Sequence, residues 1–179
     1  MIVEEQNVIT ITYELRDGGP EGELLERMDI HYPFIFLFGT GKLLPAFEEQ
    51  LFGLTANDSF EFTLKPEQAY GPVEPGNIID VPQKAFQIDG EVPPNMLVEG
   101  NYVALTDDQG ETHHGKILSF DEEKAKVDFN HAMAGKTLHF KGAIIHIRKA
   151  TVDELIRKHY IKADGVRRPD FGEQGNFYV

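Results

Sequence analysis

The chain has 179 residues, 41% of them hydrophobic and 11% aromatic, which suits one ordinary domain or two small ones. Its 17 basic and 30 acidic residues give a formal net charge of −13, and such a negative field disfavours binding to nucleic acid. With no cysteine, disulfides and cysteine-based metal sites are excluded. The first residues show no secretory signal, and no apolar run is long enough to span a bilayer, so we expect a cytoplasmic protein without a membrane partner.

The first part of the chain is patterned as strands around one short helix. Apolar and polar residues alternate over 9–15 and 60–65, with the period of a half-buried strand. Residues 34–38 are apolar on both faces, which predicts a strand that is covered on both sides or borders a ligand pocket. Apolar residues recur at helical spacing over 44–51, and Gly53 is placed to end that helix. One short helix among strands predicts an α+β fold with a mainly antiparallel sheet.

The pattern changes after Gly71, where prolines punctuate a loop-like stretch with short extended pieces. Three strand-like runs follow at 102–106, 116–120 and 125–129, separated by hairpin-type turns, and they predict a small meander. The last long strand is expected at 138–148.

The end of the chain combines a helix signal with a polar tail. Thr151-Val-Asp-Glu154 is a capping box that opens a short helix, and a polar tail rich in glycine follows it. We expect this C-terminal helix and tail to occupy residues 152–179.

Several short motifs occur in a characteristic order: the Gly39-Thr-Gly41 turn, the Ala69-Tyr-Gly71 corner and the later run Asn130-His-Ala-Met-Ala-Gly135. In this order and spacing the chain resembles the FKBP-type peptidyl-prolyl isomerases, and the long segment between the last two motifs resembles the SlyD-like branch. The resemblance implies a discontinuous isomerase domain, residues 1–71 and 130–151, with a sheet around a short helix. It also implies that residues 72–129 form a mainly β insert-in-flap chaperone domain.

The resemblance implies rotation of X-Pro bonds in an aromatic pocket, with no covalent intermediate and no cofactor. Tyr13 and Phe34 match wall aromatics, Phe47 matches the pocket floor, and Phe140 matches the aromatic of the last strand. Carried over in the same way, the full set of expected site residues is Tyr13, Leu25, Glu26, Phe34, Leu43, Leu44, Phe47, Tyr70 and Phe140. From the residues alone, large aromatic side chains such as these would form the core of any such fold.

Four of these positions have distinct expected roles. Leu43 and Leu44 match the pair before the helix whose backbone amide anchors a ligand carbonyl. Tyr70 matches the tyrosine whose hydroxyl group hydrogen-bonds a substrate carbonyl. Glu26 stands where the family often has the shorter Asp, which contacts the pocket tyrosine.

The predicted insert suggests a second role, the capture of extended client segments by pairing to an open sheet edge. The candidate client-binding residues, each of which could equally be core of a small module, are Ile78, Ile79, Val81, Phe86, Met96 and Leu97. Expected partners are unfolded or proline-containing polypeptides and FK506-like macrolides, with the chain itself a monomer. Two alternatives stay open: a holdase chaperone without isomerase activity, and a regulatory module that docks one partner.

The seven histidines do not predict a metal site. Many SlyD-like proteins carry a metal-binding tail rich in His and Cys, but this chain has neither residue after His159. His113 and His114 are adjacent and would point to opposite faces of a strand, and the same holds for His139 and His146. We therefore expect these side chains at the surface and no bound metal.

Overall fold

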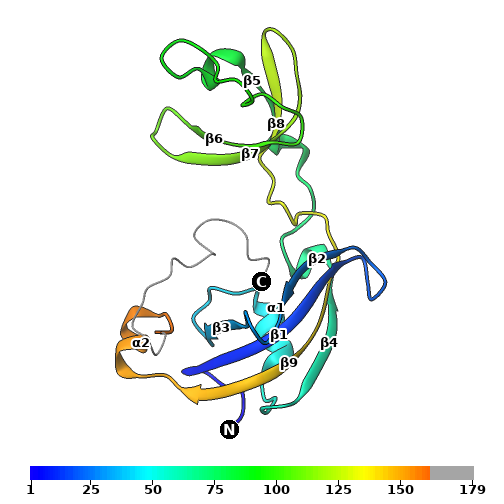
Figure 1. The fold of residues 1–179 in the computed structure, drawn as a ribbon, viewed down its shortest axis with the longest axis vertical. Coiled ribbons are helices and arrows are strands. Elements are labelled where there is room, and N and C mark those ends of the chain that lie inside the picture. The colour runs from blue at the N-terminus through cyan, green and yellow to red at the C-terminus, as the bar shows by residue number, and fades with distance from the viewer. Residues whose placement is uncertain (162–179) are drawn as a thin grey trace. The chain divides into compact units, whose positions relative to one another are not determined.

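The computed structural model describes residues 1–161, whose contacts form two compact units (Figure 1). The first unit combines Met1–Gly71 with the chain from Gly135 onward, and the second is Pro72–Ala134. The short return segment 130–134, which we expected in the isomerase domain, groups with the second unit. The predicted tail beyond residue 161 lies outside the described residues.

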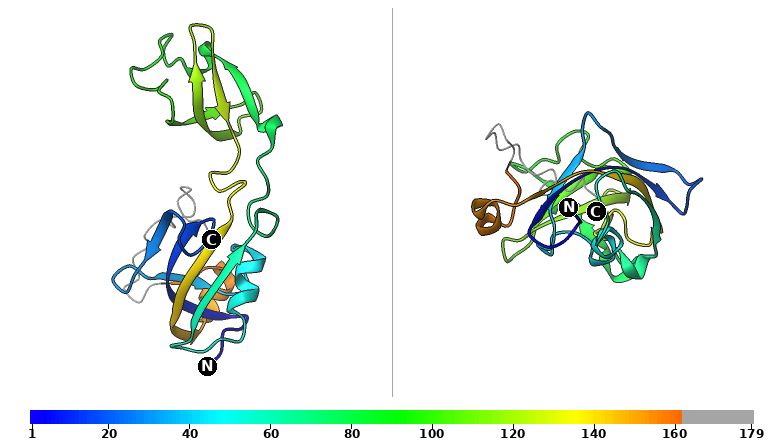
Figure 2. Two further views of the ribbon diagram at one scale, coloured as in Figure 1. Left: turned by 90° about the vertical axis from the view of Figure 1, so that its right-hand side faces the viewer. Right: turned by 90° about the horizontal axis from the view of Figure 1, so that it is seen from below.

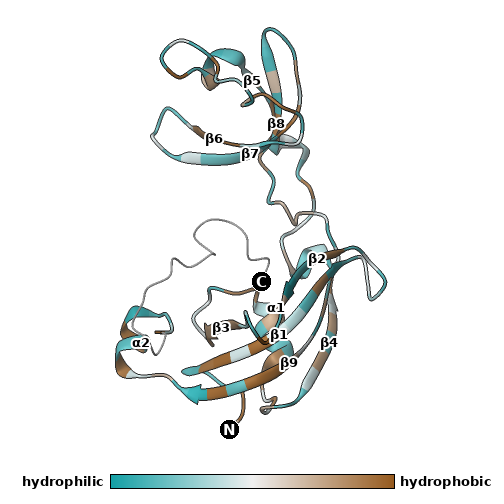
Figure 3. Ribbon diagram, in the orientation of Figure 1, coloured by the Kyte–Doolittle hydropathy of each residue, from teal (hydrophilic) through white to brown (hydrophobic). Residues whose placement is uncertain are grey.

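The first unit is built on a five-stranded antiparallel sheet with the order β2-β1-β9-β4, in which β3 also pairs with β1. The strands are β1 (Asn7–Asp17), β2 (Leu24–Met28), β3 (Phe34–Leu37), β4 (Ser59–Leu64) and β9 (Leu138–Lys149). This confirms the predicted α+β class with an antiparallel sheet. Apolar and polar residues alternate along β1, as the banded colouring of Figure 3 shows. One face of the strand is therefore in the core, with Ile9, Ile11, Tyr13 and Leu15 buried.

Helix α1 (Pro45–Leu51) covers the apolar face of this sheet (Figure 2). It begins with a proline, which suits the first helical position because the missing N–H would have no partner there. Phe47 and Leu51 are its buried residues, one turn apart. Gly53 follows with φ +82°, the left-handed conformation that commonly ends a helix.

The second unit holds a four-stranded antiparallel sheet with the order β5-β8-β7-β6. Its strands are β5 (Ile78–Pro82), β6 (Tyr102–Thr106), β7 (Thr112–Phe120) and β8 (Lys124–Asp128). The buried residues of its core are Val81, Phe86, Val103, Ile117, Ala125 and Val127. Short 3-10 turns at Pro75–Asn77 and Gln83–Phe86 flank β5, and another, at Pro66–Gln68, precedes Tyr70 in the first unit.

Helix α2 (Val152–Arg157) follows β9 and begins at the predicted capping box, with the Thr151 side chain accepting a hydrogen bond from the N–H of Glu154. Glu154 is only 1% exposed, and its carboxylate accepts two hydrogen bonds from Arg148 and one from the N–H of Ile161. This carboxylate therefore ties α2 and the chain after it to the end of β9. Among residues 1–161, no helix is long and apolar enough to cross a membrane.

Candidate functional site

Aromatic side chains from four elements meet on the apolar face of the first sheet. Tyr13 of β1 lies 6.0 Å, centroid to centroid, from Phe34 of β3 and 6.0 Å from Phe140 of β9. Phe140 in turn lies 5.0 Å from Phe47 of α1, edge to face. Tyr13, Phe47 and Phe140 are at most 2% exposed, while Phe34 is half-buried and stacks on Phe36. The strand register makes this convergence possible because Phe140 pairs with Leu15, two residues from Tyr13 on the same face.

The backbone of β9 approaches β1 closely beside Tyr13, at a position that carries no side chain. Tyr13 pairs across the β1–β9 ladder with Gly142. A Cβ atom on Gly142 would lie 2.0 Å from the carbonyl oxygen of Thr12 and 2.7 Å from the ring of Phe60. Only glycine fits at this point of close approach.

The hydroxyl group of Tyr13 donates a hydrogen bond of 3.0 Å to Oε2 of Glu26 on β2. The longer Glu side chain thus reaches the tyrosine from the position where the family often has Asp. Burial raises the pKa of the Tyr13 hydroxyl well above its usual range, and the Glu26 carboxylate and nearby Tyr70 add to the effect. Tyr13 therefore stays protonated and acts as a hydrogen-bond donor at any physiological pH.

Leu43, Leu44 and Tyr70 are half-buried and lie at the ends of the elements around the aromatic cluster. Leu44 is the residue before α1, with an extended backbone (φ −59°, ψ 124°). Tyr70 follows the 3-10 turn at Pro66–Gln68, which Gly71 closes by donating its N–H to the Pro66 carbonyl. Leu25 is half-buried in β2 and is skipped in the pairing with β1, since Glu26 pairs with Leu15 and Leu24 with Arg16.

The ring of Phe62 also joins the cluster, although the expected site did not include it. Phe62 of β4 pairs with Phe140 across the β4–β9 ladder, with ring centroids 5.4 Å apart, and lies 5.7 Å from Phe47. The alternation of Phe60, Phe62 and Leu64 was visible in the sequence, but only the register shows which ring faces Phe140.

Four of the six expected client-binding residues belong to the core of the second unit or pack against it, the alternative that the sequence left open. Val81 and Phe86 are 9% and 2% exposed and belong to the core cluster, and Met96 and Leu97 pack against that cluster. These side chains are used to hold the small module together, because a unit of this size must bury most of its large apolar residues. Ile78 is half-buried, and Ile79 is 47% exposed on the edge strand β5.

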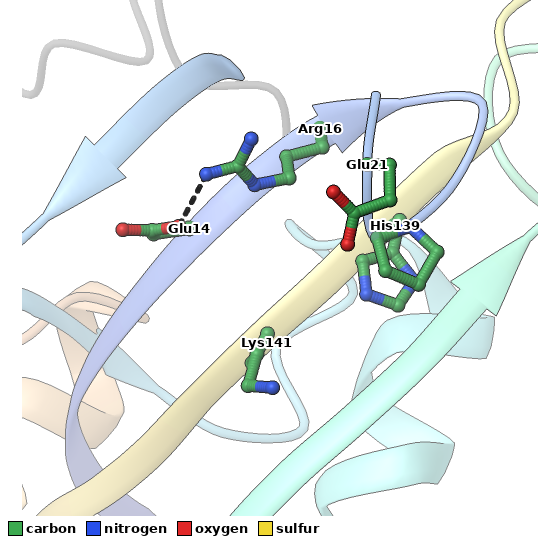
Figure 4. A pocket seen from close by; sticks show the side chains of 6 residues that line it. Glu14, Arg16, Glu21, His139 and Lys141 are labelled. Atoms are coloured by element: carbon green, nitrogen blue, oxygen red, sulfur yellow. Dashed lines mark hydrogen bonds and ion pairs between the residues drawn. The ribbon is translucent and has the colours of Figure 1, made fainter. Parts of the chain in front are cut away.

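A separate hollow of about 290 Å³, lined mostly by ionisable residues, lies on the opposite face of the first sheet (Figure 4). It is lined by Glu14, Arg16, Pro20, Glu21, His139 and Lys141. Four of the lining residues lie on β1 and β9 and alternate there with Tyr13, Leu15 and Phe140, so the sheet itself separates the hollow from the aromatic cluster. The other two, Pro20 and Glu21, lie between β1 and β2. None of the expected site residues borders it.

Two histidines differ in their surroundings. His139, expected at the surface, is 4% exposed; its Nδ1 lies 2.8 Å from the Thr63 hydroxyl and its Nε2 lies 3.4 Å from Oε1 of Glu61. His113 is exposed at the β6–β7 hairpin, 2.8 Å from Asp107, and Glu111 brings a third potential ligand atom within 4.8 Å of both. Such exposed acidic groups are common without a metal, so the expectation of no metal stays a prediction.

Comparison with known proteins matches residues 2–141 to the family described as FKBP-type peptidyl-prolyl cis-trans isomerase. The SlyD isomerase of Aeromonas hydrophila is 36% identical over 166 residues, covering 92% of this chain and 74% of the relative. A probable FKBP-type 16 kDa isomerase of Pseudomonas fluorescens is 33% identical, over 82% of this chain and 92% of the relative. SlyD of Treponema pallidum is 30% identical, over 87% of this chain and 84% of the relative. The chain therefore belongs to the FKBP-type peptidyl-prolyl cis-trans isomerases, in their SlyD-like branch, and is an isomerase.

Proposed function

We propose that this isomerase binds X-Pro segments of unfolded polypeptides against the aromatic cluster and accelerates rotation by desolvating the prolyl amide. Rotation about an X-Pro bond faces a barrier of about 18–20 kcal/mol and takes tens to hundreds of seconds unaided. The twisted amide has lost its resonance, and its carbonyl is less polar than that of the planar form. A dry apolar site therefore favours the transition state over the solvated ground state, with no nucleophile and no cofactor.

The observation that carries this proposal is the convergence of Tyr13, Phe34, Phe47 and Phe140 from four separate elements. Neighbouring rings of this group lie 5.0–6.0 Å apart, centroid to centroid, and Phe36, which stacks on Phe34, lies 6.5 Å from Phe47. These distances are those of packed aromatic groups. Phe34 is the half-buried member of the four, so its ring offers the cluster an accessible surface for a proline ring. Burial, together with the Glu26 carboxylate, keeps Tyr13 neutral by raising its pKa, and the hydrogen bond to Glu26 holds its hydroxyl group in place.

Polar groups at the edge of the cluster can orient the substrate. Within residues 1–161, the backbone N–H groups of residues 41–44 donate no hydrogen bond to the protein. An extended Leu44 beside the cluster thus presents a donor for a substrate carbonyl. We assign the hydroxyl group of Tyr70 as a second such donor, in accord with the family pattern.

For the second unit we propose client capture at the β6 edge of its sheet. In the described part of the chain β6 pairs only with β7, which leaves its other edge able to add an extended peptide as a further strand. Large apolar side chains are also exposed on this unit: Ile79, Ile88, Val98, Tyr102, Leu118 and Phe120. The net charge of −13 keeps such a surface soluble and does not attract nucleic acid.

The deciding experiment compares catalysis of a proline-limited refolding reaction with catalysis on a short prolyl peptide. We expect acceleration of both, inhibition of both by an FK506-like macrolide, and a larger gain on the whole protein. Tyr70→Phe should lower kcat/KM on the peptide, whereas Tyr32→Phe should not, because Tyr32 is 75% exposed in the same unit. Unchanged catalysis in Tyr70→Phe would refute the role given to its hydroxyl group. No acceleration of either substrate, with aggregation still suppressed, would favour the holdase alternative.

A further inference from the structure

The turn between β3 and α1 is held from the helix side by a single carboxylate. Oε1 of Glu48, in the first turn of α1, accepts a hydrogen bond of 3.0 Å from the backbone N–H of Gly39. Glu48 is half-buried and, among residues 1–161, forms no ion pair. Burial raises the pKa of its carboxyl group, opposed by the Gly39 N–H and reinforced by nearby Glu5. Burying part of a carboxylate without a neighbouring cation costs folding free energy, and the hydrogen bond from Gly39 offsets part of that cost.

The backbone conformation of this turn requires glycine at position 39. Its φ of +78° lies in the left-handed region, and a Cβ atom there would lie 2.9 Å from Cγ of Glu5. Glu5 thus closes one side of the glycine, while its N–H points to Glu48. Before this point the chain is held by the hydrogen bond from the Phe38 N–H to the Asn7 carbonyl.

After Gly39 the turn has few other supports. The Thr40 hydroxyl group donates to the Leu37 carbonyl at 3.2 Å, and in the described residues no backbone N–H of residues 41–44 is engaged. The path of Leu43 and Leu44 past the aromatic cluster therefore depends on its two ends, the Gly39 bond to Glu48 and the start of α1. Glu48 bridges these ends, because it belongs to the first turn of α1 and its side chain accepts the hydrogen bond from Gly39.

We infer that Glu48 is a positioning residue for the isomerase: its carboxylate fixes the turn so that the Leu44 N–H meets the substrate carbonyl. The inference rests on the proposed function, and it adds a residue outside the expected site set, one that would act through the Gly39 turn. Removing the acceptor lets the turn drift from the geometry in which the Leu44 amide binds. Loss of one hydrogen bond to a charged group, partly open to water, corresponds to a fall in kcat/KM of about three- to tenfold.

The test uses the full chain and four variants, with turnover of a short prolyl peptide as the first readout. Glu48→Ala should lose about three- to tenfold in kcat/KM, and Glu48→Asp should also lose activity because its carboxylate is one methylene further from Gly39. Glu48→Gln keeps an acceptor oxygen at the same reach and should stay near wild type. Glu49→Ala is the matched control, since Glu49 is exposed on the same helix and should have no effect.

The second readout is amide hydrogen exchange of Gly39, measured by NMR on the same samples. The Gly39 amide should be protected in the wild type and in Glu48→Gln, and should exchange faster in Glu48→Ala and Glu48→Asp. If the wild type proves inactive, the proposed function fails, while the exchange data still decide whether Glu48 holds the turn. Three results would each overturn the inference. The first is wild-type kcat/KM in Glu48→Ala, and the second is an equal loss of kcat/KM in Glu48→Gln and Glu48→Ala. The third is a Gly39 amide exchange rate in Glu48→Ala that equals that of the wild type.

Discussion

Truncation of Phe140 tests whether the aromatic cluster is at once the core of the first unit and the floor of the site. The Phe140 ring is fully buried and lies within 5.0–6.0 Å, centroid to centroid, of Phe47, Phe62 and Tyr13. It comes from β9, which pairs with both β1 and β4 at the centre of the sheet. Phe140→Ala would therefore leave a cavity bordered by rigid strands, and the site has little freedom to collapse.

The expected cost follows from this packing. A Phe→Ala change in a well-packed core destabilises by about 3–5 kcal/mol, through lost transfer energy and the residual cavity. Since domains are stable by about 5–15 kcal/mol, the variant should remain folded at low temperature but with a much reduced margin. Phe52→Ala is the matched control, because its ring is 61% exposed in the same unit, and we expect a change of about 1 kcal/mol or less.

The assay is urea unfolding followed by circular dichroism, with peptide isomerisation measured at 10 °C on the same samples. We expect a lower unfolding midpoint at an unchanged slope for Phe140→Ala, and a loss of kcat/KM larger than the unfolded fraction explains. A destabilisation below about 1 kcal/mol would refute the packed position of Phe140. Full activity per folded molecule would refute its part in the site.

Three further predictions concern other parts of the molecule. The hydrogen bonds from Arg148 and from the backbone amides of Thr151 and Ile161 lower the pKa of Glu154 from 4.5 to about 2. The free energy of unfolding of the wild type should therefore fall by about 3 kcal/mol as the pH drops from about 5 to 2. In urea unfolding measured across that pH range, Glu154→Gln should not show this loss. Tyr13→Phe removes the 3.0 Å hydrogen bond to Glu26 and should cost about 1–2 kcal/mol, so an unchanged thermal midpoint would contradict that bond. Tyr102→Ser, at a side chain 64% exposed on β6, should slow catalysed protein refolding but not peptide turnover; equal losses on both substrates would argue against capture at this edge.

Local periodicity predicted the elements whose burial pattern is regular. Strands β1, β4 and β9 and helix α1 appeared within a few residues of their observed bounds, because one buried face imposes a period of two or 3.6. The capping box at Thr151 likewise marked the start of α2, since that signal is contained in four consecutive residues. The order of short motifs was enough to indicate the family, which the comparisons then showed.

Strands without such a pattern were missed. β2 (Leu24–Met28) has no alternation, and it exists because it pairs with β1 and brings Glu26 to Tyr13. β5 (Ile78–Pro82) lies in a proline-rich stretch and becomes a strand by pairing with β8, more than forty residues later. Pairing between distant segments depends on tertiary contacts that no local window contains.

The residue types of the site were determined by the sequence, but their arrangement was decided only by the tertiary structure. Tyr13 and Phe140 lie near opposite ends of the described chain, and the antiparallel register of β1 and β9 brings their rings to 6.0 Å. The same register placed His139 on the other face, buried against Thr63, and the packing of the small second unit drew Phe86 into its core. An apolar side chain carries the same hydrophobic free energy wherever it lies in the sequence, so only packing determines whether it forms a core or faces a client.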